Sequence, residues 1–363
     1  MKHFRDWSGS TALSGADPLV TSLAIRAARM GRGRYIRDAF QTFDQMTMDS
    51  AGAFLVGELE RLDPMVHLPL VSTTWVRDID LRTDVQMSDA TTSYTLTSFG
   101  AAGGAKSNGI NWGSADQTTI PRVTLDISKT ANPLDLVTYE VAYTIPELRM
   151  AEATGRPIDS QMIAGMNLKH QMDVDQCVYI GDSDKGTYGL VNSGNVTNTA
   201  NVATGSGGST SWVNKSPDEI LADINEIVTS TWASTGYAVP PSKLLVAPQP
   251  FGYISTQPVV INGTGVAETI LSYVKTRNVL TAEKGIPLEI FAVKWLDHTV
   301  RGVSTDRMVA YTQRQEFVRF PMVPLQPVQP QFRGIWISVP YYGRLGVIET
   351  VYPETLAYRD GIG

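Results

Sequence analysis

The segment with the most suggestive chemistry runs from Gly100 to Ser107 and reads Gly-Ala-Ala-Gly-Gly-Ala-Lys-Ser. Glycine-rich loops that end in Lys-Ser or Lys-Thr bind nucleotide phosphates, because their backbone N–H groups and a following helix N-terminus face the anion. Here Ala105 stands where such a loop requires glycine, and residues 108–113 do not follow a helical pattern. We therefore interpret the segment as the flexible tip of a hairpin rather than as a nucleotide site.

Metal ligands and nucleophiles do not gather in a recognisable pattern. Asp182, Asp184 and Gly186 resemble part of a calcium loop, but a third ligand before the glycine and a closing glutamate are missing, so we expect a solvated turn. Cys177 has no paired histidine and is interpreted as a small buried hydrophobe. No two histidines have the i, i+4 spacing of a helical zinc site; they are His3, His67, His170 and His298. The sequence therefore predicts no catalytic residue, no cofactor site and no metal site.

Composition excludes several classes of protein. The chain has 363 residues, 42% hydrophobic and 18% charged, with a formal net charge of −6. Proteins that grip nucleic acid as their main task are usually basic, so any contact with DNA is expected to be local, weak and non-specific. A single cysteine excludes an intrachain disulfide and fits folding in a reducing cytoplasm. We expect no signal peptide, transmembrane helix or membrane partner, because no apolar run is long enough.

Alternation of apolar and polar residues predicts two strands that flank a long loop within a strand-rich stretch at 71–143. Tyr94 and Leu96 alternate with threonines, and Val123, Leu125 and Ile127 alternate with polar residues. Residues 99–122 between them are rich in Gly, Ser, Asn and Ala. A loop of that length in a compact domain is normally functional or disordered, so we predict a protruding hairpin with its tip there.

Helices are predicted after residue 143. The longest covers 158–180, ends at Gly181, and should bury a face formed by Ile163, Met166, His170, Val174 and Cys177. Capped starts are predicted at Thr144 with Glu147 and at Ser216 with Glu219, and a further helix over about 266–274. Strands are expected at 244–246 and 289–295. In the last 60 residues we expect two main strands at 335–339 and 345–352. Prolines should break the strand-like run before them into short strands, and they are Pro321, Pro324, Pro327 and Pro330.

Two stretches carry a resemblance to a known family. The long helix runs directly into VYIGD at 178–182 and, after a short turn, YGLVN at 188–192. The C-terminal stretch at 342–356 reads YGRLGVIETVYPETL. Their order and spacing resemble the junction after the long helix and the closing strand of tailed-phage major capsid proteins with the Hong Kong 97-like fold. Within that group the chain is most similar to the family catalogued as DUF2184.

The resemblance implies an α+β capsid fold of five parts. Residues 1–70 would be an N-terminal arm, 71–143 would hold strands and an extended β-hairpin loop, and 144–215 a peripheral domain with its spine helix at 158–180. Residues 216–335 would form an axial domain, and 336–363 strands that return to the peripheral domain. The N-terminus lacks a long charged helical extension, which implies a separate scaffolding protein or assembly without one.

The same resemblance implies a function and partners. The chain would assemble with itself into hexamers and pentamers of an icosahedral phage head that encloses double-stranded DNA. Its partners would include portal, scaffolding and decoration proteins, and it would assemble in the host cytoplasm and reside in the virion capsid. Many weak contacts between long projections would add by multivalency.

Residue-level expectations follow from these roles. Subunit contacts at the loop tip would come from Gly100, Gly103, Gly104, Lys106, Asn108 and Trp112. Candidates at the capsomer axis are Asn262, Gly263 and Thr264. An inner-face basic cluster would consist of Arg26, Arg29, Arg32, Arg34 and Arg37. These arginines would touch DNA or an acidic scaffold, form a solvated face, or pair with acidic residues of a neighbouring subunit.

Three alternatives stay open at the level of the sequence. An encapsulin-like protein compartment shares the fold and would enclose protein instead of DNA. A β-rich surface-binding protein fits the Thr, Ser, Asn and Gly content, but the long helices argue against it. A hydrolase lacks both a nucleophile elbow and paired acids.

Overall fold

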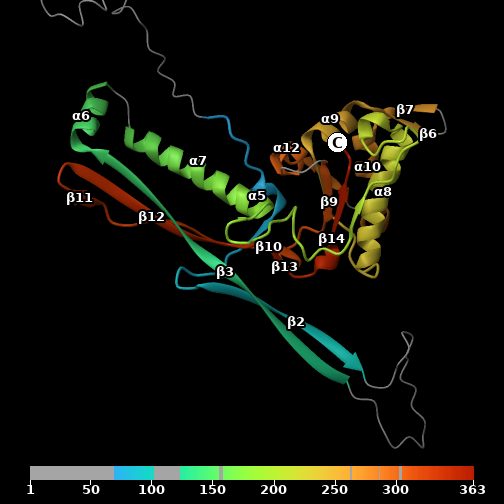
Figure 1. Ribbon diagram of the computed structural model, residues 1–363, viewed down its shortest axis with the longest axis horizontal. Coiled ribbons are helices and arrows are strands. Elements are labelled where there is room, and N and C mark those ends of the chain that lie inside the picture. Colours follow the sequence, from blue (N-terminus) through green and yellow to red (C-terminus); the bar gives the residue numbers. More distant parts are fainter. Residues whose placement is uncertain (1–68, 102–122, 155–157, 262–263, 286, 302–304) are drawn as a thin grey trace, which may run out of the picture. The chain divides into compact units, whose positions relative to one another are not determined.

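The computed structural model describes residues 69–363 apart from 102–122, 155–157, 262–263, 286 and 302–304 (Figure 1). The chain divides after Pro69, and Leu70–Gly363 forms one compact unit to which every element below belongs. In the described part of the chain, no helix has the length and apolarity needed to cross a membrane.

A seven-stranded sheet carries the long hairpin. Its path is β1 (Asp80–Arg82), β10 (Val318–Pro327), β12 (Trp336–Gly346), β3 (Val123–Thr144) and β2 (Thr91–Ala101), with β11 (Gln331–Arg333) on β12 and β13 (Glu349–Thr350) on β10. The strand β3 serves two partners, because residues 134–144 pair with β12 and residues 123–133 pair with β2. The two strands predicted to flank the loop are confirmed as β2 and β3.

The prediction of short C-terminal pieces was wrong. Strand β10 continues through Pro321, Pro324 and Pro327 because it changes partner along its length. It pairs with β1 as far as Pro321 and with β12 from Met322, and its register with β12 shifts between Val323 and Gln326. A missing N–H is tolerated where pairing is interrupted in this way. The strand predicted at 335–339 lies within the longer β12, whereas the one predicted at 345–352 is divided between the end of β12 and the short β13.

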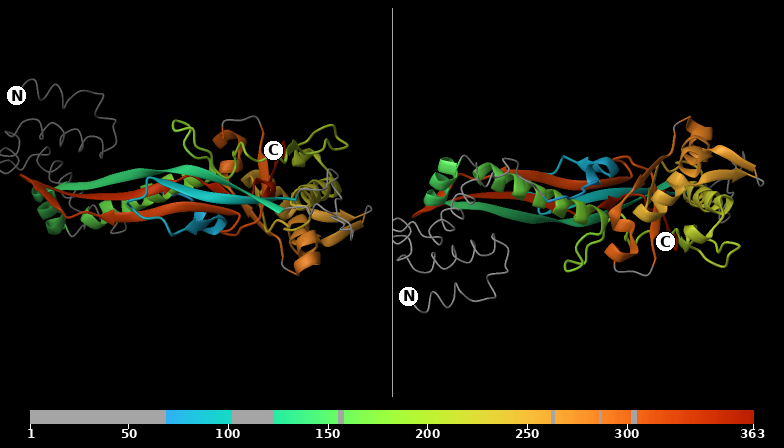
Figure 2. Two further views of the ribbon diagram at one scale, coloured as in Figure 1. Left: turned by 90° about the horizontal axis from the view of Figure 1, so that it is seen from below. Right: turned by 90° about the horizontal axis from the view of Figure 1, so that it is seen from above.

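One layer of helices lies beside this sheet (Figures 1 and 2). The helix α7 (Ile158–Tyr179) packs on β3 and contacts α5 (Trp75–Asp78) and α6 (Ile145–Thr154). It matches the predicted rod to within one residue, and it buries Met166, His170, Val174, Asp175, Val178 and Tyr179. Ile163, predicted to be buried, is exposed, and Cys177 is only half-buried. The short α5 lies where strands were expected.

The capping boxes predicted at Thr144 and Ser216 are present at the starts of two helices. The Thr144 backbone N–H donates to Glu147 Oε2, and the Glu147 N–H donates to Thr144 Oγ1. The same reciprocal pair joins Ser216 and Glu219 at the start of α8 (Pro217–Ser234). Such capping boxes satisfy backbone donors that a helix terminus leaves unpaired.

A five-stranded sheet separates two hydrophobic cores. Its order is β4 (Thr199–Asn201), β14 (Leu356–Asp360), β9 (Arg307–Tyr311), β5 (Lys243–Val246) and β8 (Glu289–Ala292). Successive strand residues point to opposite faces, so Leu245 joins the core that contains Val174 and Tyr179 of α7. Leu244 and Val246 join a second core, with α8, α9 (Pro248–Thr256) and α10 (Ile270–Thr276).

The helix predicted over 266–274 begins later than expected. Residues Thr264–Thr269 form β7, which pairs with β6 (Pro258–Ile261), and Thr269 then caps α10 by accepting the Ser272 N–H. The strand predicted over 289–295 ends at Ala292, and a 3-10 turn, η2, covers Lys294–Leu296. The remaining short elements are η1 (Trp212–Asn214), α11 (Val279–Lys284), α12 (His298–Arg301) and η3 (Pro353–Thr355).

Candidate assembly surfaces

The turn after α7 brings two glycines and an asparagine together at the end of the helix. Gly181 has φ +79°, a left-handed conformation that favours glycine. Gly189 crosses the end of α7 so closely that a β-carbon there would lie 2.2 Å from the Tyr179 carbonyl carbon. Asn192 closes the turn: its Oδ1 accepts the Gly189 N–H at 2.7 Å and its Nδ2 donates to the Ile180 carbonyl at 2.8 Å. The motif is therefore a packed joint between α7 and the rest of the unit.

A buried acid on α7 holds the segment by which the chain enters this unit. Asp175 Oδ1 accepts the backbone N–H groups of Thr74 at 2.9 Å and Trp75 at 3.2 Å. Its Oδ2 accepts Trp295 Nε1 at 2.7 Å and lies 3.1 Å from Lys294 Nζ. Asp175 is thus a positioning residue that the sequence analysis missed, although an acid beside the apolar stripe of a predicted helix was a signal for it.

The base of the long hairpin is held by buried ion pairs. Glu349 is fully buried and lies 3.0 Å from Arg82 Nη1 and 2.7 Å from Arg319 Nε. Arg344 Nη1 donates to the Leu134 carbonyl at 2.8 Å, where β3 changes from β12 to β2. Arg82 Nη1 also donates to the Ser93 carbonyl of β2 at 3.2 Å, so the ion pairs of Glu349 are connected to the first strand of the hairpin at its base.

The far half of the hairpin has one apolar face. Residues directly opposite on two antiparallel strands share a face, and the register pairs Phe99 with Leu125 and Thr97 with Ile127. The neighbouring pair, Ser98 with Asp126, lies on the other face. The exposed apolar side chains, each between 56% and 74% exposed, are Phe99, Val123, Leu125 and Ile127. We call these four residues the hairpin stripe; exposed apolar residues gathered in this way mark contact surfaces.

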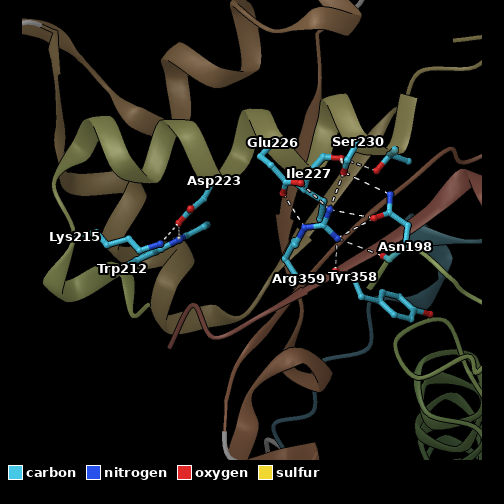
Figure 3. A network of polar contacts seen from close by, with 10 residues as sticks. Asn198, Trp212, Lys215, Asp223, Glu226, Ile227, Ser230, Tyr358 and Arg359 are labelled. Carbon is cyan, nitrogen blue, oxygen red and sulfur yellow. Dashed lines mark hydrogen bonds and ion pairs between the residues drawn. The ribbon is translucent and has the colours of Figure 1, made fainter. Parts of the chain in front are cut away.

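A polar network joins the last strand to α8 (Figure 3). Arg359 on β14 lies 2.7 Å from Glu226 through Nε and donates through Nη1 to Asn198 Oδ1 at 3.0 Å. Nearer the start of α8, Lys215 Nζ lies 2.5 Å from Asp223 Oδ2, and both side chains are buried. The first group of contacts joins β14 to α8, and the second joins α8 to the segment that precedes it.

Most of the predicted contact residues lie outside the described residues. Gly100 is within β2 opposite Thr124, and Thr264 begins β7 opposite Ile261. The other candidates, all outside the described ranges, are Gly103, Gly104, Lys106, Asn108, Trp112, Asn262, Gly263 and the five arginines at 26–37. Their proposed contacts remain predictions.

Two titratable side chains on α7, Cys177 and His170, have pKa values shifted by burial toward their neutral forms. Burial raises the pKa of Cys177 to about 11, so its thiol stays protonated near neutral pH. Burial lowers the pKa of His170, whose Nδ1 has no hydrogen-bond partner in the part of the chain that the structure describes. Asp182 accepts the Asp184 N–H at 3.0 Å within a turn. Cys177 and His170 are thus side chains that pack along α7.

Comparisons with known proteins decide the family. The sequence model described as major capsid protein matches residues 109–362, well over half of the chain. The chain belongs to the major capsid protein family. It is therefore a structural subunit of a capsid shell, as the sequence predicted. No curated protein matches it significantly.

Solved structures agree on the fold. The capsid of Myoviridae Phage XM1 is 17% identical, with 84% of this chain and 98% of that chain covered and a TM-score of 0.66. The capsid of a native GTA particle is 12% identical, with 86% and 99% covered and a TM-score of 0.59. The structure from Mycobacterium phage Bobi is 11% identical, with 86% of this chain and 99% of that chain covered and a TM-score of 0.54. The α+β, Hong Kong 97-like fold of this major capsid protein is thereby confirmed, while the DUF2184 assignment stays a prediction.

Proposed function

We propose that copies of this chain assemble into the hexamers and pentamers of an icosahedral phage head that encloses double-stranded DNA, and that its role is structural and not catalytic. The observation that carries the assembly proposal is the hairpin stripe. Its four large apolar side chains are exposed on a strand pair in which β2 has β3 as its only partner among the described strands. Covering such a face with a neighbouring subunit would remove it from water.

The geometry of the unit supports a ring-forming contact. The stripe and the body of the sheet are different surfaces, so a stripe that packs on the sheet of the next copy forms a heterologous contact. Such contacts generate rings when the rotation from one copy to the next closes. The buried Glu349 cluster fixes the base of the hairpin. A defined projection can therefore reach the same place on every neighbour.

Further partners follow from the same role. We propose portal, scaffolding and decoration proteins as partners and the host cytoplasm as the place of assembly, in keeping with the single cysteine. DNA contact would be weak and non-specific given the net charge of −6. The five arginines at 26–37 are the proposed inner-face contacts, and the residues predicted at the loop tip and capsomer axis are the proposed subunit contacts.

The proposed role also divides the chain into five parts. These are the arm 1–70, the loop region 71–143, the peripheral domain 144–215, the axial domain 216–335 and the returning strands 336–363.

Negative-stain electron microscopy with sedimentation of the purified full chain tests the assembly. We expect uniform closed shells, or hexamers and pentamers that convert to shells when a scaffolding protein is co-expressed. A chain that stays monomeric at high concentration with and without that partner would contradict the proposal. The content of particles from infected cells separates the alternatives: enclosed DNA supports a phage head, and enclosed protein without DNA supports an encapsulin-like compartment.

A further inference from the structure

Three side chains with metal-binding atoms converge beside α12, apart from the assembly surfaces. Asp297 Oδ1, His298 Nδ1 and Asp306 Oδ1 all lie within 4.8 Å of one another. His298 Nδ1 is 2.5 Å from Asp306 Oδ1 and 3.8 Å from Asp297 Oδ1. We propose that these three residues bind a divalent transition-metal ion, of which Zn²⁺ fits the donor set best.

The donor types select the class of ion. Zinc is bound by imidazole nitrogen and carboxylate oxygen, and three protein ligands leave a fourth position for water or another group. Calcium and magnesium prefer oxygen ligands alone, so His298 argues against both ions. The His298 side chain is 39% exposed, which gives an ion a path from solvent to the three donors.

The charge balance of the cluster is a separate argument for a cation. The Asp306 side chain is only 1% exposed and that of Asp297 is 15% exposed. Among the residues whose side chains the structure describes, which leave out Arg301, the cation that pairs with these carboxylates is His298. One imidazole can add at most one positive charge, whereas buried carboxylates need compensation. A divalent ion at this position balances both carboxylates.

The backbone already orients both carboxylates. The His298 N–H donates to Asp306 Oδ1 at 2.7 Å. Asp297 Oδ1 accepts the Thr299 N–H at 2.8 Å and the Thr299 hydroxyl at 2.5 Å. Hydrogen bonds that hold metal ligands in place raise affinity, because less order is lost when the ion arrives. The ion would join the start of α12 to the residue that precedes β9, at the side of the five-stranded sheet.

This site departs from the sequence expectation of no metal. The ligands come from two segments, with Asp306 eight positions after His298, and this is not the helical i, i+4 spacing of a zinc site. The proposal is independent of shell assembly, because each ligand belongs to a single chain and the ion would be bound by an unassembled subunit.

Zinc alone is the probe for the test. The purified full chain is stripped with a chelator, then titrated with Zn²⁺ in competition with a chromophoric chelator, and its thermal unfolding is followed with and without the ion. We expect one Zn²⁺ per subunit and a higher Tm with zinc. Asp297→Asn, His298→Ala and Asp306→Asn should each weaken binding by about tenfold or more. The control Asp184→Asn removes an exposed carboxylate elsewhere and should bind like the wild type.

Two outcomes would overturn the proposal. One is a wild-type chain that takes up no stoichiometric zinc, and the other is equal zinc affinity in the wild type and all three site variants. Asp306→Asn alters a buried group and can fail to fold. Asp297→Asn and His298→Ala change more exposed side chains and decide the question in that case.

Discussion

At the scale of single residues, one glycine in the joint after α7 and one glycine within α7 have opposite surroundings. Gly189 lies against the backbone of Tyr179 and Ile180, which cannot move aside without displacing the end of the helix. Gly165, within α7, has no atom within 4 Å of the position that a β-carbon would occupy. The same Gly-to-Ala change should therefore have opposite effects at these two positions.

We predict that Gly189→Ala destabilises the unassembled subunit by about 2–4 kcal/mol, because the added methyl overlaps backbone atoms. Gly165→Ala should stabilise it by about 0.5–1 kcal/mol, because alanine loses less conformational entropy in a helix. Chemical denaturation followed by circular dichroism measures both free energies of unfolding. Equal stability of Gly189→Ala and the wild type would show that the close approach at the joint is not a packing constraint.

At the scale of elements, the hairpin stripe gives the proposed assembly a direct test. Leu125→Lys puts a charge on the apolar face, and Ser98→Lys puts the same charge on the opposite face, beside Asp126. Burial of one leucine contributes about 1.5–3 kcal/mol. Leu125→Lys should therefore raise the subunit concentration needed for shell formation by about tenfold or more, and Ser98→Lys should leave it almost unchanged. Light scattering during assembly measures this concentration, and equal effects of both variants would assign the contact to another surface.

The sequence predicted those elements whose formation depends on residues close to one another in the chain. The hairpin strands, the long helix and both capping boxes follow from residues within a few positions of one another. The continuous β10 could not be predicted in this way, because its prolines are tolerated through its pairing with β1 and β12, and β1 is distant from it in the sequence. Asp175 and Thr74, which are hydrogen-bonded, are 101 positions apart in the sequence. The proposed metal ligands His298 and Asp306 are eight positions apart. Periodicity carries no information about such contacts.

At the scale of the whole unit, the five-stranded sheet makes two hydrophobic cores depend on each other. Leu244 and Leu245 are neighbours on β5, both fully buried, yet each belongs to a different core. Because the strands between the cores are common to both, the loss of either core removes one face of the same sheet. We therefore expect residues 70–363 to unfold as one cooperative unit.

Leu244→Ala and Leu245→Ala test this coupling with identical chemistry on one strand. Each should lower the free energy of unfolding by about 2–5 kcal/mol, because each leaves a cavity in a packed core. Differential scanning calorimetry of the unassembled subunit should show one transition in the wild type, displaced to lower temperature in both variants. Two resolved transitions, one sensitive to Leu244 and the other to Leu245, would mean that the cores are independent. Cooperative unfolding would instead mean that strain applied to one core during shell assembly is transmitted through β5, β9 and β14 to the other core.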